Sequence, residues 1–285
     1  MPTSPAYDAV VIGAGPNGLA AAITLARAGR SVVVYEARAT VGGGCRTAEL
    51  TLPGFRHDVC SAIHPLGIGS PFLRTLPLAR LGVEWCQPPL ELAHPLDDGA
   101  DDVADGGAAV LARSVDETAA ALGADGAAYT RLMAPLAASW DAIAAAILGP
   151  ARLPAHPLAL ARFGFGAIQS AAGLARRTFA GERARALLAG MSAHSMLPLE
   201  RSPSAAFGLV LGILGHAVGW PLPRGGSQTL ADALAIYLRE LGGVIITDTP
   251  IESLDQLPSA RALLFDTAPR DLPRIAGARL DARYQ

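Results

Sequence analysis

Short β-branched runs flank one alanine-rich run in the first part of the chain, and this pattern predicts a strand, a helix and a second strand. Tyr7–Ile12 and Ser31–Tyr35 are short and strongly apolar, as expected of buried strands. Between them, Leu19–Ala28 has helical composition and stops at Gly29. The chain is therefore predicted to open with a βαβ unit.

A glycine-rich turn joins the first strand to the helix, with Gly13, Gly15 and Gly18 in the spacing Gly-x-Gly-x-x-Gly. Gly13 can make a tight turn, Gly15 lets a diphosphate approach the backbone, and Gly18 allows close packing of helix on strand. The helix N-terminus then offers free N–H groups and a positive dipole end. Glu36 follows the second strand, where an acceptor for ribose hydroxyls belongs. This order favours dinucleotide binding over a chance glycine cluster, and it predicts as contacts Gly13, Ala14, Gly15, Pro16, Asn17, Gly18, Glu36, Ala37 and Arg38.

A second glycine-rich turn, Val41–Thr47, follows closely and carries Arg46. This arrangement resembles the amine-oxidase and phytoene-desaturase group of flavoproteins, in which the second turn lies against the flavin half of FAD. The first turn alone leaves NAD and FAD open, and the resemblance implies FAD. It also implies further cofactor-binding residues, with Ile251 as the adenine contact: Gly43, Gly44, Arg46, Thr47, Ser61 and Ile251.

The resemblance extends along most of residues 7–275. Segments Leu52–Ser61 and Trp220–Gln228 resemble a subgroup of this family, pyridine nucleotide-disulfide oxidoreductase domain-containing protein 2, which is related to the carotenoid desaturases. Members of the group continue well beyond the position of Gln285. The resemblance therefore implies that the C-terminal part of the flavin site is missing and that the chain is truncated.

The middle of the chain has helical texture. Ser114 can cap a helix that begins at Val115. Asp125 can cap a helical stretch Gly126–Leu148, which is expected to kink or split at Pro135.

Two later apolar stretches bear on membranes. Leu158–Ala180 fits either a core helix with snorkelling arginines, which is favoured, or an interfacial helix lying on a membrane. Ala205–Trp220 is too short to span a bilayer and is predicted to be a buried helix.

Strand and helix patterns return after Gly225. They predict a helix at Thr229–Leu241 and strands at Val244–Thr247 and Ala262–Phe265. The predicted fold class is α/β, a Rossmann-like FAD/NAD(P)-binding domain with an inserted, mainly helical substrate domain, here truncated. The predicted ranges are 1–62 and 221–285 for the FAD-binding domain and 63–220 for the insertion.

Composition removes several classes of protein. The chain has 285 residues, of which 51% are hydrophobic, so it can bury a large core. Its 23 basic residues are all arginine, which excludes a Schiff-base lysine or a Walker-type phosphate lysine. The net charge of −2 and the mixed signs give no basic face for nucleic acid.

Cysteine and histidine spacing predicts neither a metal site nor a disulfide framework. Cys45, Cys60 and Cys86 are far apart in sequence and lack a C-x-x-C motif. The acidic segment 97–107 lacks EF-hand spacing and is interpreted as a solvated hairpin turn. The N-terminus has no targeting pattern, so a cytoplasmic location is expected.

The function expected from these features is that of an FAD-dependent oxidoreductase, in which flavin N5 takes a hydride from an apolar small molecule. Whether the 285-residue chain is active by itself stays open. Two alternatives remain: a non-catalytic dinucleotide-binding remnant or half of a split flavoenzyme, and an NAD-dependent dehydrogenase. Expected partners are the apolar substrate, a second chain or a homo-oligomer, and a peripheral membrane contact. No catalytic residue is assigned, but His57, Asp58 and Ser61 are the first candidates, with a structural role favoured for each.

Overall fold

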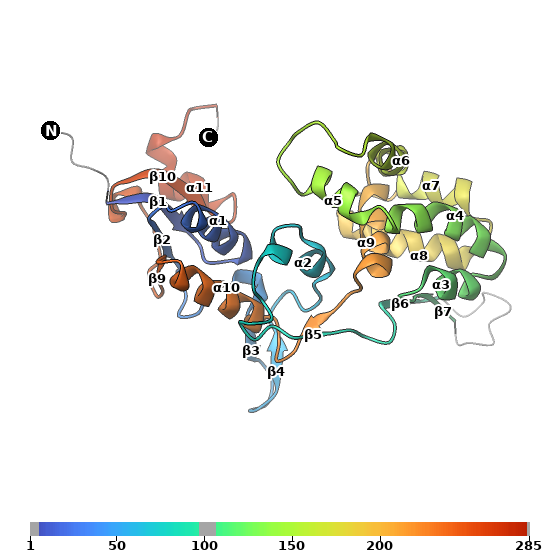
Figure 1. Cartoon of the computed structure of the whole chain (residues 1–285), viewed down its shortest axis with the longest axis horizontal. Helices are drawn as coiled ribbons and strands as arrows, with labels where there is room; N and C mark the ends of the chain where they lie inside the picture. The colour runs from blue at the N-terminus through green and yellow to red at the C-terminus, as the bar shows by residue number, and fades with distance from the viewer. Residues whose placement is uncertain (1–5, 97–106, 284–285) are drawn as a thin grey trace. The chain divides into compact units, whose positions relative to one another are not determined.

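A computed structural model describes residues 6–96 and 107–283, which form two compact units. Unit 1 contains residues 6–62, 77–85 and 222–283, and unit 2 contains residues 63–76, 86–96 and 107–221. In Figure 1 the blue start and the orange-to-red end of the chain meet in unit 1, whereas unit 2 is mostly green and yellow. Residues 97–106 of the predicted acidic turn lie outside the described part.

Residues 77–85 belong with unit 1, although the sequence placed them in the insertion. Val83 packs on Leu230 and Ala233, and the Arg80 guanidinium donates to both carboxylate oxygens of Glu240, at 2.9 and 2.5 Å. These contacts join the segment to the last part of the chain, which a linear division of the sequence does not show.

Unit 1 is built on a four-stranded parallel sheet in the order β10-β1-β2-β9. Its strands are β1 (Tyr7–Ile12), β2 (Val32–Tyr35), β9 (Val244–Ile246) and β10 (Ala260–Phe265). The order reverses at β1, since β2 and β9 extend the sheet on one side and β10 on the other. Ligands of open parallel sheets bind outside the carboxyl ends of the strands at this kind of reversal.

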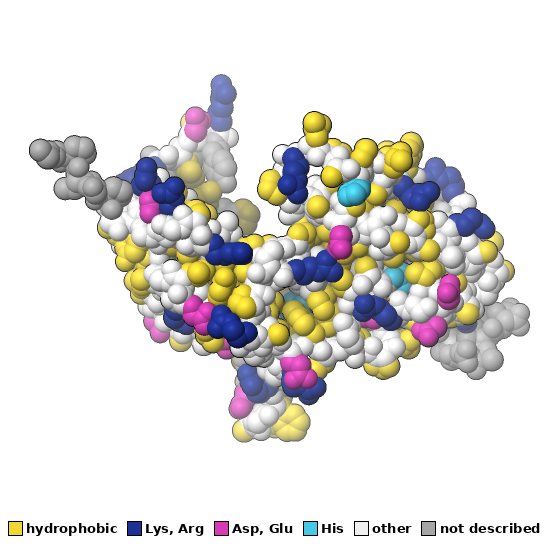
Figure 2. Space-filling view, viewed as in Figure 1, with side chains coloured by type: hydrophobic (Ala, Val, Ile, Leu, Met, Phe, Trp, Pro, Cys, Tyr) yellow, Lys and Arg dark blue, Asp and Glu magenta, His cyan; other side chains and the backbone are white. Residues whose placement is uncertain are grey.

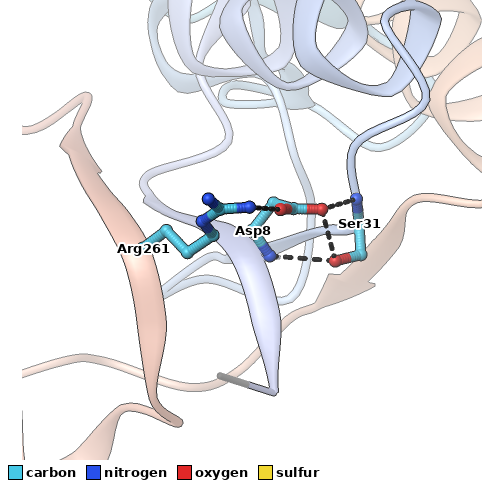
Figure 3. A network of polar contacts seen from close by, with 3 residues as sticks. All are labelled: Asp8, Ser31 and Arg261. Atoms are coloured by element: carbon cyan, nitrogen blue, oxygen red, sulfur yellow. Dashed lines mark hydrogen bonds and ion pairs between the residues drawn. The ribbon is translucent and has the colours of Figure 1, made fainter. Parts of the chain in front are cut away.

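A polar network fixes the start of three chain segments (Figure 3). The Asp8 carboxylate accepts from the Ser31 backbone N–H at 3.0 Å, the Ser31 hydroxyl at 3.1 Å and the Arg261 guanidinium at 3.3 Å. These bonds hold the pKa of Asp8 below its ordinary value, with the Ser31 backbone bond as the largest cause. The network links β1 to the residue before β2 and to β10.

Helices cover the sheet of unit 1. Helix α1 (Pro16–Arg27) packs on β1, β2 and α10 (Gln228–Glu240). It begins three residues earlier than predicted, with Pro16 in its first turn, where proline costs no hydrogen bond. Val10, Ile12 and Val33 pack with Ile275 of α11 (Asp271–Ala276). Burial on both faces explains why the sequences of β1 and β2 are almost continuously apolar.

A hairpin follows the second glycine-rich turn, which contains a 3₁₀ turn at Gly43–Cys45. Strands β3 (Thr47–Glu49) and β4 (Arg56–Asp58) pair antiparallel. Farther along, the two-residue strands β5 (Trp85–Cys86) and β8 (Leu222–Pro223) form a short pair. The predicted α/β, Rossmann-like fold of this part is confirmed.

Unit 2 is mainly helical, as predicted. It contains one antiparallel pair, β6 (Leu92–Pro95) and β7 (Ala108–Leu111). Its helices are α2 (Pro65–Gly69), α3 (Val115–Ala121), α4 (Gly126–Ala137), α5 (Trp140–Ile147), α6 (Pro157–Ala167), α7 (Ala171–Thr178), α8 (Glu182–Ser192) and α9 (Ala205–Ala217). α9 contributes buried Leu209, Ile213 and Leu214 to the core, which confirms the predicted buried helix.

Of the two residues predicted to cap helices, Ser114 does so and Asp125 does not. The Ser114 hydroxyl accepts from the N–H groups of Asp116 and Glu117, as expected of a cap. The predicted Asp125 cap is wrong, because its carboxylate instead accepts from the N–H groups of Ala180 and Gly181, at 2.8 and 2.7 Å. This carboxylate therefore fastens the start of α8 to the start of α4.

Two predicted long helices are each divided in two. The stretch 126–148 passes through Pro135 and breaks only after Ala137, and α5 then begins at Trp140. The stretch 158–180 breaks between α6 and α7, which are bent by 101°, and Ser170 caps α7. No single helix in the described ranges is long and apolar enough to cross a membrane, although α6 and α7 pass that test as a bent pair.

Candidate dinucleotide site

The first glycine-rich turn lies at the carboxyl end of β1. The Gly13 N–H donates to the Tyr35 carbonyl at 2.8 Å, and Gly13 has a φ of +101°, which favours glycine. A Cβ on Gly18 would overlap the Gly13 carbonyl oxygen. Glycine is therefore required at both positions for helix α1 to follow β1 so closely.

Glu36 is buried at the end of β2, and two backbone groups hold its carboxylate. One oxygen accepts from the Ala14 N–H at 2.9 Å and the other from the Arg38 N–H at 3.0 Å. Since each carboxylate oxygen has two lone pairs, acceptor capacity remains for hydroxyl groups of a ligand. Glu36 thus both fixes the first turn and keeps a polar edge in a defined orientation.

The second glycine-rich turn contacts the first. The Gly42 N–H donates to the Ala14 carbonyl at 2.8 Å, and a Cβ on Gly43 would lie 3.1 Å from the Gly15 Cα. Gly42 and Gly43 both have positive φ angles, +121° and +53°. Close approach of the two turns therefore depends on glycine in each.

One cavity of about 520 Å³ collects most of the predicted cofactor-binding residues. Its size falls within the usual range for small-molecule and cofactor sites. Predicted residues that line it are Gly13, Gly15, Pro16, Asn17, Glu36, Ala37, Arg38, Gly43, Gly44, Arg46 and Ile251. Ala14, Gly18, Thr47 and Ser61 do not line it.

Arg46 lines this cavity, and its side chain has an unused donor. Its Nε is buried and has no hydrogen-bond partner. Since a buried donor without a partner costs free energy, this group is well suited to a ligand that offers an acceptor.

Asp266 is a site residue that the sequence analysis missed. It directly follows β10, and its carboxylate accepts from the Gly18 N–H at 2.8 Å. A Cβ on Gly15 would lie 2.6 Å from the same carboxylate oxygen, and Asp266 also lines the cavity. An acidic side chain therefore already occupies the N-terminus of α1. A single Asp after an apolar strand does not indicate a site residue by itself. Its role becomes visible only when the pairing of β10 with β1 is known.

The far wall of the cavity comes from the last part of the chain. Thr249, Pro250 and Ile251 follow β9, and α11 contributes Asp271, Arg274 and Ile275. Ile251 and Ile275 are buried together against the sheet. Arg274 forms an ion pair of 3.5 Å with Asp271 one turn earlier, so the basic group sits next to an acid.

The first candidates for catalysis have structural partners. Asp58 accepts from the Thr47 hydroxyl at 2.6 Å and from the Ser227 N–H at 2.8 Å. The Ser227 hydroxyl donates to the Ser61 carbonyl at 2.6 Å. His57 shares a hydrogen bond of 2.8 Å with the exposed Thr51 hydroxyl. Thr47, Asp58 and Ser61 therefore fasten the hairpin to the start of α10 and do not line the cavity.

No metal chemistry emerges from the cysteines and histidines. Among the described residues, no group of three or more His, Cys, Asp or Glu side chains could hold a metal ion. Cys45, Cys60 and Cys86 are free thiols, and burial raises the pKa of Cys45.

Comparisons with known proteins agree with this geometry. The fold and the site define a Rossmann-like dinucleotide-binding domain, and residues 11–75 match the family model described as NAD(P)-binding Rossmann-like domain. Pyridine nucleotide-disulfide oxidoreductase domain-containing protein 2 from Mus musculus is 51% identical over 57 residues, which are 20% of this chain and 10% of that protein.

Solved structures with this fold cover nearly the whole chain. An oxidoreductase from Methanosarcina mazei has a TM-score of 0.61 at 18% identity and covers 97% of this chain, which matches 63% of that structure. Putrescine oxidase has a TM-score of 0.60 at 23% identity, with 98% and 62% covered. The chain thus shares the fold of these oxidoreductases but spans less than two thirds of the solved chains and about a tenth of the curated relative.

Proposed function

We propose that unit 1 binds FAD and that the protein is an FAD-dependent oxidoreductase acting on an apolar small molecule. The observation that carries the proposal is that one cavity at the carboxyl edge of the sheet is lined by both glycine-rich turns, Glu36 and Arg46. An NAD site needs only the first turn. The second turn lies beside the first and adds a buried, unpartnered arginine donor, which supports a cofactor longer than the ADP half.

The residues present fit such a cofactor. Gly13, Gly15 and Gly18 put no side chain over the first turn, so a diphosphate would approach its backbone beside the Asp266 carboxylate, which lies against Gly15 and Gly18. Glu36 is held by two N–H groups and would accept from the ribose hydroxyls. Arg46 would give its free Nε–H to an acceptor on the flavin half. Bound FAD supplies a two-electron acceptor at N5, while these side chains orient the cofactor.

The choice of substrate class rests on the resemblance to desaturases and on the apolar helices of unit 2. In the described part of unit 2, no group of three or more His, Cys, Asp or Glu side chains could hold a metal ion. With this function we propose a cytoplasmic location, which the three free thiols support.

Absorbance of the purified chain tests the proposal. A yellow protein with a flavin spectrum, or a colourless one that takes up added FAD, is expected. Gly15→Val should abolish this uptake, because the new side chain meets Asp266 and the approach to the backbone closes. Gly164→Val is the matched control, since no atom lies within 4 Å of a Cβ there.

Titration of the purified chain with FAD and with NADH separates the alternative functions. A chain that binds NADH tightly but not FAD would be a dehydrogenase of the NAD-dependent kind. A folded chain that takes up neither cofactor would refute the proposal for this chain.

A further inference from the structure

Helix α6 presents an unusual apolar face to solvent. Leu158, Phe165 and Ile168 lie on one side of the helix and its end, and their exposed fractions are 86%, 73% and 67%. Leu153 in the preceding loop is 94% exposed. Single exposed apolar residues are common, but four large ones along one short segment mark an interaction surface.

Basic residues accompany this apolar face, and acidic ones do not. Arg162 is exposed on the same side of α6, and Arg152 lies in the loop beside Leu153. Arg176 and Arg177 follow on α7, and the sequence contains neither Asp nor Glu from Ala142 to Gly181. In Figure 2 yellow and dark-blue side chains lie together over α6 and α7, with no magenta among them.

The acid that precedes this stretch is already paired. Asp141 lies in the first turn of α5, and its carboxylate lies 2.5 Å from the Arg74 guanidinium. The exposed segment therefore keeps its positive charge at neutral pH.

We propose that the segment Arg152–Ile168 docks unit 2 on the surface of an anionic lipid membrane. Leu153, Leu158, Phe165 and Ile168 would enter the boundary between headgroups and acyl chains, and Arg152 and Arg162 would contact anionic headgroups. Membrane association of this kind needs two signals, apolar burial and positive charge, and both lie on this segment. An apolar protein partner would tolerate acidic residues near the contact. An anionic membrane would repel them, and forty successive residues here contain no acid.

The geometry of α6 and α7 fits docking and not spanning. The helices meet at 101°, and the opposite side of α6 is occupied, since Phe163, Gly166 and Ala167 are buried in the core of unit 2. Only one face is free to meet the lipid, so the contact is peripheral.

Vesicle co-sedimentation of the whole chain tests this inference. Vesicles of phosphatidylcholine with added phosphatidylglycerol should sediment the protein, and vesicles of phosphatidylcholine alone should do so far less. Arg152→Gln/Arg162→Gln should weaken partition to the anionic vesicles by about fivefold for each arginine. Binding should also fall as salt is added.

The apolar signal is tested separately with Leu158→Ser/Phe165→Ser/Ile168→Ser, which should abolish sedimentation. Control variants carry apolar-to-Ser and Arg-to-Gln changes at exposed sites of unit 1, Ile236→Ser/Val244→Ser and Arg30→Gln/Arg239→Gln, and should sediment like the parent. Circular dichroism verifies folding of each variant.

Three outcomes would overturn the inference: no sedimentation with anionic vesicles, equal sedimentation with neutral ones, or unchanged sedimentation of both segment variants. Self-association through this face, without vesicle binding, would also overturn it. None of these results depends on FAD, so the test is independent of the proposed function.

Discussion

Asp266→Asn offers the sharpest test of where a dinucleotide binds. The Asp266 carboxylate accepts from the Gly18 N–H at 2.8 Å and lies against Gly15, so a diphosphate over this turn must approach a negative charge. Two unit charges at about 5 Å repel by about 3 kcal/mol at an effective dielectric constant of about 20. Screening in the open cavity reduces this value, and we expect ADP to bind the variant about 1.4 kcal/mol, or tenfold, more tightly.

The same change should cost a little stability. The asparagine oxygen can still accept from Gly18, but the negative charge at the N-terminus of α1 is lost, which costs about 0.3–1 kcal/mol. Unfolding by urea measures this loss. The variant should therefore be slightly less stable and bind nucleotide more tightly, a combination that general damage to the fold would not produce.

Calorimetric titration with ADP at low and high salt is the assay, because ADP is common to FAD and NAD. Asp232→Asn is the matched control, since Asp232 is exposed on α10 and does not line the cavity. The gain in affinity should shrink at high salt. An Asp266→Asn chain that folds but binds ADP no better than the parent would refute a diphosphate site beside this carboxylate.

Three further predictions concern other buried or linked groups. Glu36→Ala should weaken ADP binding by about 1–3 kcal/mol and also destabilise the chain, because the Ala14 N–H loses its partner; unchanged calorimetric affinity would contradict this role. Asp8→Asn should destabilise the protein at pH 7 and progressively less at acidic pH: the folded-state pKa of Asp8 is lowered, so its stabilisation is present above the unfolded pKa of about 3.9 and is lost as the pH falls through the folded value. Urea midpoints of both proteins across acidic pH values test this, and a loss that does not change with pH would refute it. Burial lowers the pKa of His216, which accepts from the Tyr129 hydroxyl, so unit 2 should lose stability as the pH falls below about 6.5. In thermal melts, His216→Gln should reduce the fall of the melting temperature with falling pH. An unchanged fall would show that another group causes the pH dependence.

The sequence by itself determined the first half of the nucleotide-binding fold. Glycine spacing, the β-branched strands and the position of Glu36 are local signals, because only glycine tolerates the positive φ of Gly13 and the close packing at Gly18. These signals predicted the strand, turn, helix and strand in order. They also predicted seven residues that line the cavity, and the family resemblance added Gly43, Gly44, Arg46 and Ile251.

Helix limits in unit 2 were less accessible to sequence reasoning. Both long stretches are rich in helix-forming residues throughout, so their composition did not locate the breaks after Ala137 and Ala167. The Asp125 cap failed for a related reason, since a carboxylate binds whichever N–H groups the fold brings near, here those of Ala180 and Gly181.

Only the tertiary structure decided which distant residues complete the site. Parallel pairing of β10 with β1 brings Asp266 against the turn at Gly15 and Gly18, 248 residues from Gly18 along the chain. Thr47, which the resemblance implied as a cofactor contact, and Asp58, for which a structural role was favoured, both fasten the start of α10. Local sequence specifies backbone shape through the dihedral preferences of a few residues. Which charged and lining residues reach the cavity depends on strand order, which no local pattern encodes.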